Sequence, residues 1–353
     1  MKVHLHFETR LEHRKESPRY KTMQEFKSFS KRLETLTLDQ FEDFALELVQ
    51  FQAQTNPIYG AYLQARKINP AGIQKLEDIP FLPIQFFKDA SVFCGITDAI
   101  TQTYSSSGTT GTITSKHLLW SEEFYLDHAQ RLFEKEYGSL SDFHVLALLP
   151  AYLERPGSSL VAMASHFIRK SNSDASGFYL YNQEELMQQL GTLAHGNRKV
   201  LLLGVTFALL DLAESPAVFE GFPNLIVMET GGMKGRRREM IREEVHQRLR
   251  AFFKVEQIHS EYGMTELLSQ VYSKGNGKYQ VPSCMRVMLR DLNDPFSPST
   301  RSQGGINIID LANFHSCAFI ETQDIGFWDE NGFLEVLGRF DHSELRGCNL
   351  LVS

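Results

Sequence analysis

Apolar residues recur at helical spacing in the first part of the chain. Thr37-Leu38-Asp39-Gln40 has the pattern of a capping box, in which two side chains satisfy backbone N–H groups at the start of a helix. The residues that follow place one apolar face together: Phe41, Phe44, Ala45, Leu48 and Phe51. Ser121, followed by two glutamates, predicts the start of another helix that runs through His128 and Phe133. Residues 1–35 are polar and charged, and we interpret them as an N-terminal extension or an outer helix.

Continuous apolar runs then alternate with helical patterns. The runs cover residues 144–149, 199–205 and 224–229, and helices are predicted at residues 183–193, 207–213 and 236–253. A strand that is apolar on both faces is typical of a parallel sheet with helices on both sides. We therefore expect an α/β core over residues 36–280.

The pattern changes after about residue 281. Short strands separated by turns are predicted at 304–310, 318–321 and 332–337. This spacing favours an antiparallel or β-barrel-like subdomain over residues 281–340, followed by a tail at 341–353.

Composition narrows the class of protein. The 353 residues exceed one ordinary core, and 42% hydrophobic with 22% charged residues is usual for soluble proteins. A net charge of −7 argues against nucleic acid as the main partner. We find no apolar leader and no run of 18 apolar residues, so we expect no signal peptide and no membrane span. Four widely spaced cysteines suggest free thiols and a cytoplasmic location.

The segment Ser106-Ser107-Gly108-Thr109-Thr110-Gly111 combines hydroxyls with two glycines. Glycine lets the backbone turn successive N–H groups toward one point, and hydroxyls donate to the same point. Such a nest of donors suits a phosphate. The segment is not a Walker loop, because no Gly-Lys-Ser/Thr follows at the required spacing. The alternative interpretation is a flexible polar linker.

Two later segments follow predicted strands. Gly231 and Gly232 end one strand, where paired glycines let a ligand approach the backbone; an ordinary turn is the alternative. The second segment is Glu261-Tyr262-Gly263-Met264-Thr265-Glu266. It offers an aromatic ring for a base, a hydroxyl for a phosphate and a carboxylate for Mg²⁺.

Asp324 follows a short strand near the end of the chain. A carboxylate there can accept two hydrogen bonds from a ribose diol, although a turn-capping aspartate is equally common. Gly338-Arg339-Phe340-Asp341 comes next, and then Arg346-Gly347-Cys348.

Taken in this order, the motifs resemble those of the adenylate-forming superfamily of acyl-activating enzymes over roughly residues 105–347. The resemblance implies the large N-terminal α/β domain of that superfamily, and ATP with Mg²⁺. The β- and γ-phosphates of ATP would be held by the loop Ser106, Ser107, Gly108, Thr109, Thr110 and Gly111. Further nucleotide-binding positions would be Gly231, Gly232, Glu261, Gly263 and Met264.

The resemblance also implies individual roles. Tyr262 would stack on adenine, Thr265 would contact the α-phosphate, and Glu266 would bind Mg²⁺. Asp324 and Arg339 would hold the ribose hydroxyls. Asp341 would be a hinge.

Two features depart from the superfamily pattern. The usual Pro-Lys after the loop is absent, and the nearest lysine is Lys116, whose role is open. Within these 353 residues we also find no match to the small C-terminal domain of the superfamily or to its lysine. The chain is in this respect similar to the acyl-protein synthetases, the fatty-acid-activating components of bacterial luminescence reductase complexes, which end just after the hinge and carry an acyl-accepting cysteine near the C-terminus. Cys348 matches that cysteine by resemblance; the alternative is a small buried hydrophobic residue.

The sequence thus predicts an enzyme that activates a carboxylic acid, fatty or aromatic, and transfers the acyl group to Cys348 and then to a partner such as a reductase or carrier protein. One alternative is an acyl-CoA ligase similar to phenylacetate ligases. Another is a nucleotide-binding protein without turnover. His259 and His144 are interpreted as structural, and no zinc cluster is predicted.

Overall fold

The computed structural model describes residues 18–106, 114–150, 157–180, 182–232 and 240–339. The helices of these residues are α2 (Pro18–Glu34), α3 (Phe41–Thr55), α4 (Pro57–Ala65), α5 (Phe86–Asp89), α6 (Glu122–Tyr137), α7 (Ser159–Ser171), α8 (Gln183–Leu193), α9 (Thr206–Ala213) and α10 (Arg242–Phe253). The early strands are β1 (Leu82–Pro83), β2 (Gln102–Ser105), β3 (Lys116–Leu119), β4 (Phe143–Leu148), β5 (Gly177–Tyr179), β6 (Lys199–Val205) and β7 (Leu225–Thr230). The later strands are β8 (His259–Tyr262), β9 (Val271–Ser273), β10 (Lys278–Gln280), β11 (Met285–Arg290), β12 (Gln303–Asp310), β13 (Phe319–Trp328) and β14 (Leu334–Arg339).

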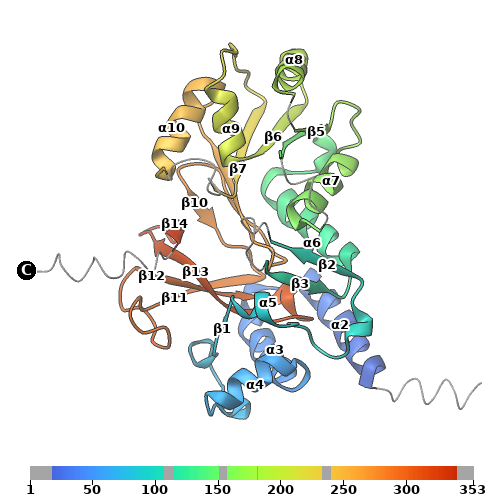
Figure 1. Ribbon diagram of the computed structural model, residues 1–353, viewed down its shortest axis with the longest axis vertical. Helices are drawn as coiled ribbons and strands as arrows, with labels where there is room; N and C mark the ends of the chain where they lie inside the picture. The colour runs from blue at the N-terminus through green and yellow to red at the C-terminus, as the bar shows by residue number, and fades with distance from the viewer. Residues whose placement is uncertain (1–17, 107–113, 151–156, 181, 233–239, 340–353) are drawn as a thin grey trace, which may run out of the picture.

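Five parallel strands in the order β5-β4-β6-β7-β8 form one half of a twelve-stranded sheet. The apolar runs predicted from the sequence become β4, β6 and β7, and β6 is buried from Val200 to Val205. Figure 1 shows α9 and α10 on one side of these strands and α6 and α7 on the other. The predicted α/β class is confirmed.

The other half of the sheet is antiparallel. β8 pairs with β9, β9 with β10, and β10 with β14, after which the order runs β13-β12-β11. The antiparallel strands expected after residue 281 are therefore present. In the described ranges they continue the same sheet as an open path from β5 to β11 instead of closing separately, and β1 lies parallel to β13.

Two predicted boundaries are corrected. The helix expected at 236–253 begins at Arg242, because Ile241 has an extended backbone (ψ 148°) and two glutamates occupy the first helical turn. The strand expected at 318–321 continues to Trp328, since its partners β12 and β14 extend the hydrogen-bonded ladder on both sides.

The helix α3 carries the predicted apolar face and a polar contact. Its buried residues are Phe41, Phe44, Ala45, Leu48, Val49 and Gln52. Gln52 Nε2 donates to the carbonyls of Asn313 (2.9 Å) and Phe314 (3.1 Å), and the N–H of Ala318 donates to Gln52 Oε1 (2.9 Å). At the end of α3, Asn56 Nδ2 donates to the carbonyl of Ser316 (2.7 Å). The helix α3 thus holds the turn that joins β12 to β13, which we call the 310–318 turn.

The strands β2 and β3 form an antiparallel hairpin in which Ser105 pairs with Lys116. Beyond that pair, the N–H of Ser106 donates to the carbonyl of Ser115 (3.0 Å) and the N–H of Ser115 donates to Ser106 Oγ (2.9 Å). The hairpin therefore holds Ser106, the first residue of the predicted phosphate loop, beside Ser115.

None of the described helices has the length and apolarity needed to cross a membrane.

Candidate functional site

The candidate site lies where β7 and β8 end, at the carboxyl edge of the parallel strands. Thr230 pairs with Glu261 across these strands, and Thr230 Oγ1 donates to Glu261 Oε2. Gly231 follows with φ of 72°, a conformation that favours glycine. The predicted Gly231-Gly232 segment and the predicted segment 261–266 therefore start from neighbouring strand ends.

A buried carboxylate network lies beneath this edge. Thr206 Oγ1 donates to Glu229 Oε2 (2.7 Å), and Glu229 Oε1 lies 3.5 Å from His246 Nε2 and 3.8 Å from Arg242 Nε. Burial favours the neutral acid, but these three partners outweigh it and lower the pKa of Glu229. The carboxyl end of β7 is thus held against α9 through Thr206 and against α10 through Arg242 and His246.

Tyr262, Asp324 and Arg339 meet although they come from three strands. Tyr262 OH donates to Asp324 Oδ2 (2.7 Å), and Arg339 Nε lies 3.3 Å from Asp324 Oδ1. Asp324 and Arg339 are direct partners in the register of β13 with β14. Burial and the neighbouring Asp324 raise the pKa of Tyr262 well above 10, so its hydroxyl keeps its proton. Of the residues predicted to contact adenosine, Tyr262 and Arg339 are therefore each within hydrogen-bonding distance of Asp324.

Gly263 follows β8 and has no room for a side chain. A Cβ atom at this position would clash with Oε1 of Glu261, which is buried. Met264, the next predicted residue, packs partly buried against the core. The glycine therefore lets the chain leave the sheet directly above the Glu261 carboxylate.

Glu266 is buried, and its carboxyl lies near the side chain of Ser115. Burial raises its pKa, while Ser115, its own backbone N–H, Arg339 and Lys88 act in the opposite direction. The neighbouring Thr265 accepts a hydrogen bond through its carbonyl from His117 Nδ1 (2.8 Å). Two of the three predicted catalytic residues, Thr265 and Glu266, therefore lie beside the hairpin that carries Ser106 of the predicted phosphate loop.

Lys116 lies between these two contacts on β3 and is exposed. Of the predicted phosphate loop, only Ser106 is described. Residues 107–111, Asp341 and Cys348 lie outside the described residues.

Two residues of the site were missed by sequence reasoning, Ser115 and His117. Both follow the conspicuous Ser/Thr/Gly segment, in a stretch that has no motif of its own. The available signal was alternation: in a strand, positions 115 and 117 share one face while Lys116 points to the other. That face is the one turned toward Thr265 and Glu266.

Two histidines interpreted as structural, and the described cysteines, lie away from the residues listed above or are buried. His259 Nδ1 lies 3.1 Å from Tyr137 OH, and His144 Nδ1 lies 2.6 Å from Ser173 Oγ. The described cysteines, Cys94, Cys284 and Cys317, are free and buried, and burial raises their pKa values. Across the ranges given above, no group of three or more histidine, cysteine or acidic side chains is arranged to hold a metal ion.

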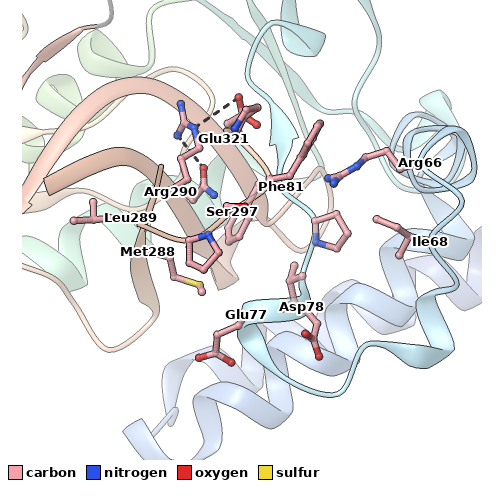
Figure 2. A pocket seen from close by; sticks show the side chains of 16 residues that line it. Arg66, Ile68, Glu77, Asp78, Phe81, Met288, Leu289, Arg290, Ser297 and Glu321 are labelled. Carbon is pink, nitrogen blue, oxygen red and sulfur yellow. Dashed lines mark hydrogen bonds and ion pairs between the residues drawn. The ribbon is translucent and has the colours of Figure 1, made fainter. Parts of the chain in front are cut away.

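A separate pocket lies beside β11, β12 and β13 (Figure 2). Its walls include Arg66 and Phe81, and Arg290 bonds Asn307 at its base (2.9 Å) with Glu321 3.9 Å away. None of the candidate site residues lines this pocket.

Comparison with solved structures identifies the fold. ATP-bound MatB from Rhodopseudomonas palustris matches 70% of this chain and 50% of its own, with 18% identity and a TM-score of 0.51. A 2-hydroxyisobutyryl-CoA ligase in complex with 2-HIB-AMP and CoA matches 88% of this chain and 71% of its own, with 15% identity and a TM-score of 0.62. The chain has the fold of adenylate-forming ligases.

The adenylate-forming fold is matched only in part. The chain spans about half the length of MatB, and the open conformation of 2-hydroxyisobutyryl-CoA ligase matches 85% of this chain and 69% of its own, at 13% identity. No protein-family model matches the sequence. No curated protein matches it either.

Proposed function

We propose that this chain activates a carboxylic acid with ATP to form an acyl-adenylate and pyrophosphate. The observation that carries the proposal is the convergence of Tyr262, Asp324 and Arg339 with Glu266, beside the β2–β3 hairpin, in a fold shared with ligases solved with ATP and with acyl-AMP. Each motif alone is weak, but here the predicted adenosine residues and the predicted metal residue lie on one edge of one sheet.

The adenosine part of ATP would be held by the cluster around Asp324. Tyr262 offers a ring whose orientation is fixed by its hydrogen bond to Asp324. The Asp324 carboxylate also accepts from Arg339, which is largely exposed and therefore able to reach a ligand. A carboxylate with an arginine beside it presents both an acceptor and a donor to a ribose diol.

The residues present fit a magnesium ion. Glu266 supplies the oxygen ligand that Mg²⁺ accepts, and its buried carboxylate would gain from a nearby cation because burial disfavours its charge. Bound there, Mg²⁺ would neutralise phosphate charge. The Ser115 side chain, on the hairpin side, favours the charged form of this carboxylate because it lowers the pKa of Glu266.

The reaction needs positioning more than covalent chemistry from the protein. A carboxylate oxygen of the acid attacks the α-phosphorus of ATP, the bond from that phosphorus to the bridging oxygen breaks, and pyrophosphate leaves. The acyl carbon then has AMP as leaving group in place of oxide. Thr265 and donors of the hairpin would stabilise charge on the phosphate oxygens.

For the second step, our first candidate acceptor is the thiol of Cys348. Its thiolate would attack the acyl carbon of the adenylate, the bond to the AMP oxygen would break, and a thioester would remain. A fatty acid as substrate and a reductase or carrier protein as final partner belong to the same proposal, which rests on the resemblance to acyl-protein synthetases. The three described cysteines do not compete for this role, because each is buried.

A second candidate acceptor is coenzyme A. It is favoured by the similarity to 2-hydroxyisobutyryl-CoA ligase, which was solved in complex with CoA. The two candidates share the adenylation step and differ only in the thiol.

Intact-protein mass spectrometry tests the proposal. The full chain is incubated with ATP, Mg²⁺ and a mixed set of fatty and aromatic acids, and is then treated with neutral hydroxylamine, which cleaves thioesters. We expect pyrophosphate release and a hydroxylamine-labile adduct whose mass identifies the acid. Pyrophosphate release without an adduct would redirect the second step to an external thiol. Absence of both, with every acid, would contradict the proposal.

Two variants separate the steps. Cys348→Ser is expected to release pyrophosphate normally and to retain no acyl label, and normal labelling would exclude Cys348. Glu266→Gln keeps the size of the side chain but removes the charge. It is expected to lose adenylation by about 100-fold, because a neutral amide holds Mg²⁺ less tightly and the charge of the reacting phosphates is then less well neutralised. An unchanged Mg²⁺ requirement in this variant would contradict the assigned metal ligand.

A further inference from the structure

The segment from Gly263 to Gln270 is buried for most of its length but has no regular helix or strand. Buried backbone groups outside regular structure need side-chain partners, since an unpaired one is costly. The partners come from far away in the sequence. Asn313 Nδ2 donates to the carbonyl of Glu266 (2.8 Å), and Asp310 Oδ2 accepts from the N–H groups of Leu268 (3.1 Å) and Ser269 (2.9 Å).

Thr265 obtains its partner from the hairpin. His117 Nδ1 lies 2.8 Å from the Thr265 carbonyl oxygen, and His117 Nε2 lies 2.8 Å from Ser316 Oγ. A carbonyl only accepts, so Nδ1 carries the hydrogen and Nε2 of the neutral ring accepts from the Ser316 hydroxyl. Burial supports the neutral form, because it lowers the pKa of His117 to about 4.

The His117 ring has little freedom to rotate. It is fully buried and stacks on His315, with ring centres 5.8 Å apart and planes 15° apart. The ring of Phe87 meets it edge-on at 5.6 Å. Packing on two sides and a hydrogen bond at each nitrogen therefore fix the position of Nδ1.

Two buried residues of the hairpin, Ser115 and His117, face two consecutive residues of the 263–270 segment, Thr265 and Glu266. His117 bonds the backbone of Thr265 (2.8 Å), and the side chain of Ser115 lies near that of Glu266. Lys116, between them, points outward. The backbone of Ser115 also bonds Ser106, the first residue of the predicted phosphate loop. The Ser115 carbonyl accepts from the N–H of Ser106, and the N–H of Ser115 donates to Ser106 Oγ.

We infer that His117 is a positioning residue, which locks the Thr265–Glu266 pair to the β2–β3 hairpin so that the Glu266 carboxylate, the proposed metal ligand, keeps its position relative to Ser106 and Ser115. This inference rests on the proposed function. His117 touches neither nucleotide nor acid in this role; it acts through Thr265.

Two substitutions of His117 by amide residues distinguish the role of Nδ1, which bonds Thr265, from that of Nε2, which bonds Ser316. In His117→Asn the amide nitrogen stands as many bonds from Cα as Nδ1 does, so it can still donate to Thr265. In His117→Gln the amide is one bond longer and matches Nε2, so it reaches toward Ser316 and leaves the Thr265 carbonyl unpaired. Ser316→Ala is the matched control, because it removes the partner of Nε2 and leaves the bond to Thr265.

The first readout does not depend on turnover. Thermal unfolding of each full-length variant is followed with ATP while Mg²⁺ is titrated, and the Mg²⁺ concentration that gives half of the stabilisation is compared. We expect His117→Gln to need about 10- to 100-fold more Mg²⁺, as is usual when a group that orients a ligand is lost. His117→Asn and Ser316→Ala should stay within about threefold of the parent protein.

The second readout is ATP–pyrophosphate exchange with the acid found above. His117→Gln should lose kcat by a similar factor with an unchanged KM for the acid, and His117→Asn should recover most of it. Equal losses in the Asn and Gln variants, or losses that follow only their melting temperatures, would overturn the inference. Should His117→Gln not fold, a raised Mg²⁺ midpoint in folded His117→Asn would overturn it, and a parental midpoint would support it.

The two readouts keep the proposals apart. If the parent protein exchanges no pyrophosphate with any acid but shows Mg²⁺-dependent stabilisation by ATP, adenylation fails as the function. The Mg²⁺ midpoints of the variants still decide the role of His117 in that case.

Discussion

Buried neutral histidines should make this protein sensitive to mild acid, and His128 offers the sharpest test. Its ring on α6 stacks on Phe124, with centres 5.8 Å apart, and its Nε2 lies 2.9 Å from Ser269 Oγ. The Ser269 hydroxyl donates to Asp310 Oδ1 (2.6 Å), so it accepts from the Nε2–H of His128. Burial, and secondly the charge of Arg131, lower the pKa of His128 from 6.5 to about 3.

The sign of the effect follows from proton linkage. The folded-state pKa is depressed, so the unfolded chain binds the proton more tightly and stability falls as the pH drops below 6.5. The loss grows until the pH nears 3. At pH 5, about 1.5 pH units below the ordinary value, it amounts to about 2 kcal/mol for this one residue, at 1.36 kcal/mol per unit.

The perturbation is His128→Gln, whose amide can still donate to Ser269 but does not titrate. Urea unfolding is measured at about pH 7.5 and about pH 5 for the parent protein, for His128→Gln and for His195→Gln, an exposed histidine. We expect His128→Gln to lose about 2 kcal/mol less than the parent between the two pH values, whatever its stability at the higher pH. His195→Gln should follow the parent.

Parallel pH dependence in all three proteins would refute this reasoning. It would mean that His128 is ionised in the folded state or that the unfolded chain keeps it neutral. Contributions of carboxylates cancel in the comparison, because the same carboxylates are present in each variant.

Three further substitutions test the site. Gly263→Ala should destabilise the protein by about 1–3 kcal/mol through its clash with the Glu261 carboxylate, measured by urea unfolding; unchanged stability would mean that the carboxylate moves aside freely. Tyr262→Phe keeps the ring but removes a hydrogen bond to a charged acceptor, so we expect a loss of about 1.5–3 kcal/mol in the unfolding free energy, and a neutral result would contradict the bond to Asp324. Gln52→Ala removes three buried hydrogen bonds to the 310–318 turn and should lower the unfolding free energy by about 3 kcal/mol or more. The Mg²⁺ concentration that gives half of the stabilisation with ATP should also rise. A parental value would argue that the turn does not hold the site.

The sequence could predict the parallel half of the sheet because its strands are long and apolar on both faces. Strands of three residues, such as β5 and β9, were not predicted, since so short a segment has no measurable periodicity. The pairing of β10 with β14, which places the last strand of the described chain inside the antiparallel half, also has no local signal. Tertiary contacts decide such pairings, and the sequence pattern describes only neighbours.

The candidate site was predictable to a similar degree. Tyr262, Asp324 and Arg339 were selected through resemblance, and the structure adds that Asp324 bonds both of the others across three strands. His117 was not selected, because its partner Thr265 is 148 residues away and neither residue marks the other in the sequence. Motifs identify the groups that face a ligand; the side chains that hold those groups in place are found only by their contacts.

The support of the 310–318 turn by α3 has a consequence for the order of folding. Gln52 and Asn313 are 261 residues apart, so the turn gains its anchor only when nearly the whole described chain has been brought together. During synthesis, the turn has no anchor until Ala318 has emerged and bonded Gln52 of α3. Until then, Asn313 is not held against the Glu266 carbonyl, and Ser316 is not held against His117, which bonds Thr265. The parallel strands can form earlier from nearer neighbours. Recovery of nucleotide binding during refolding should therefore lag behind recovery of helix and sheet, which makes ligand binding a reporter of the last step of folding in this molecule.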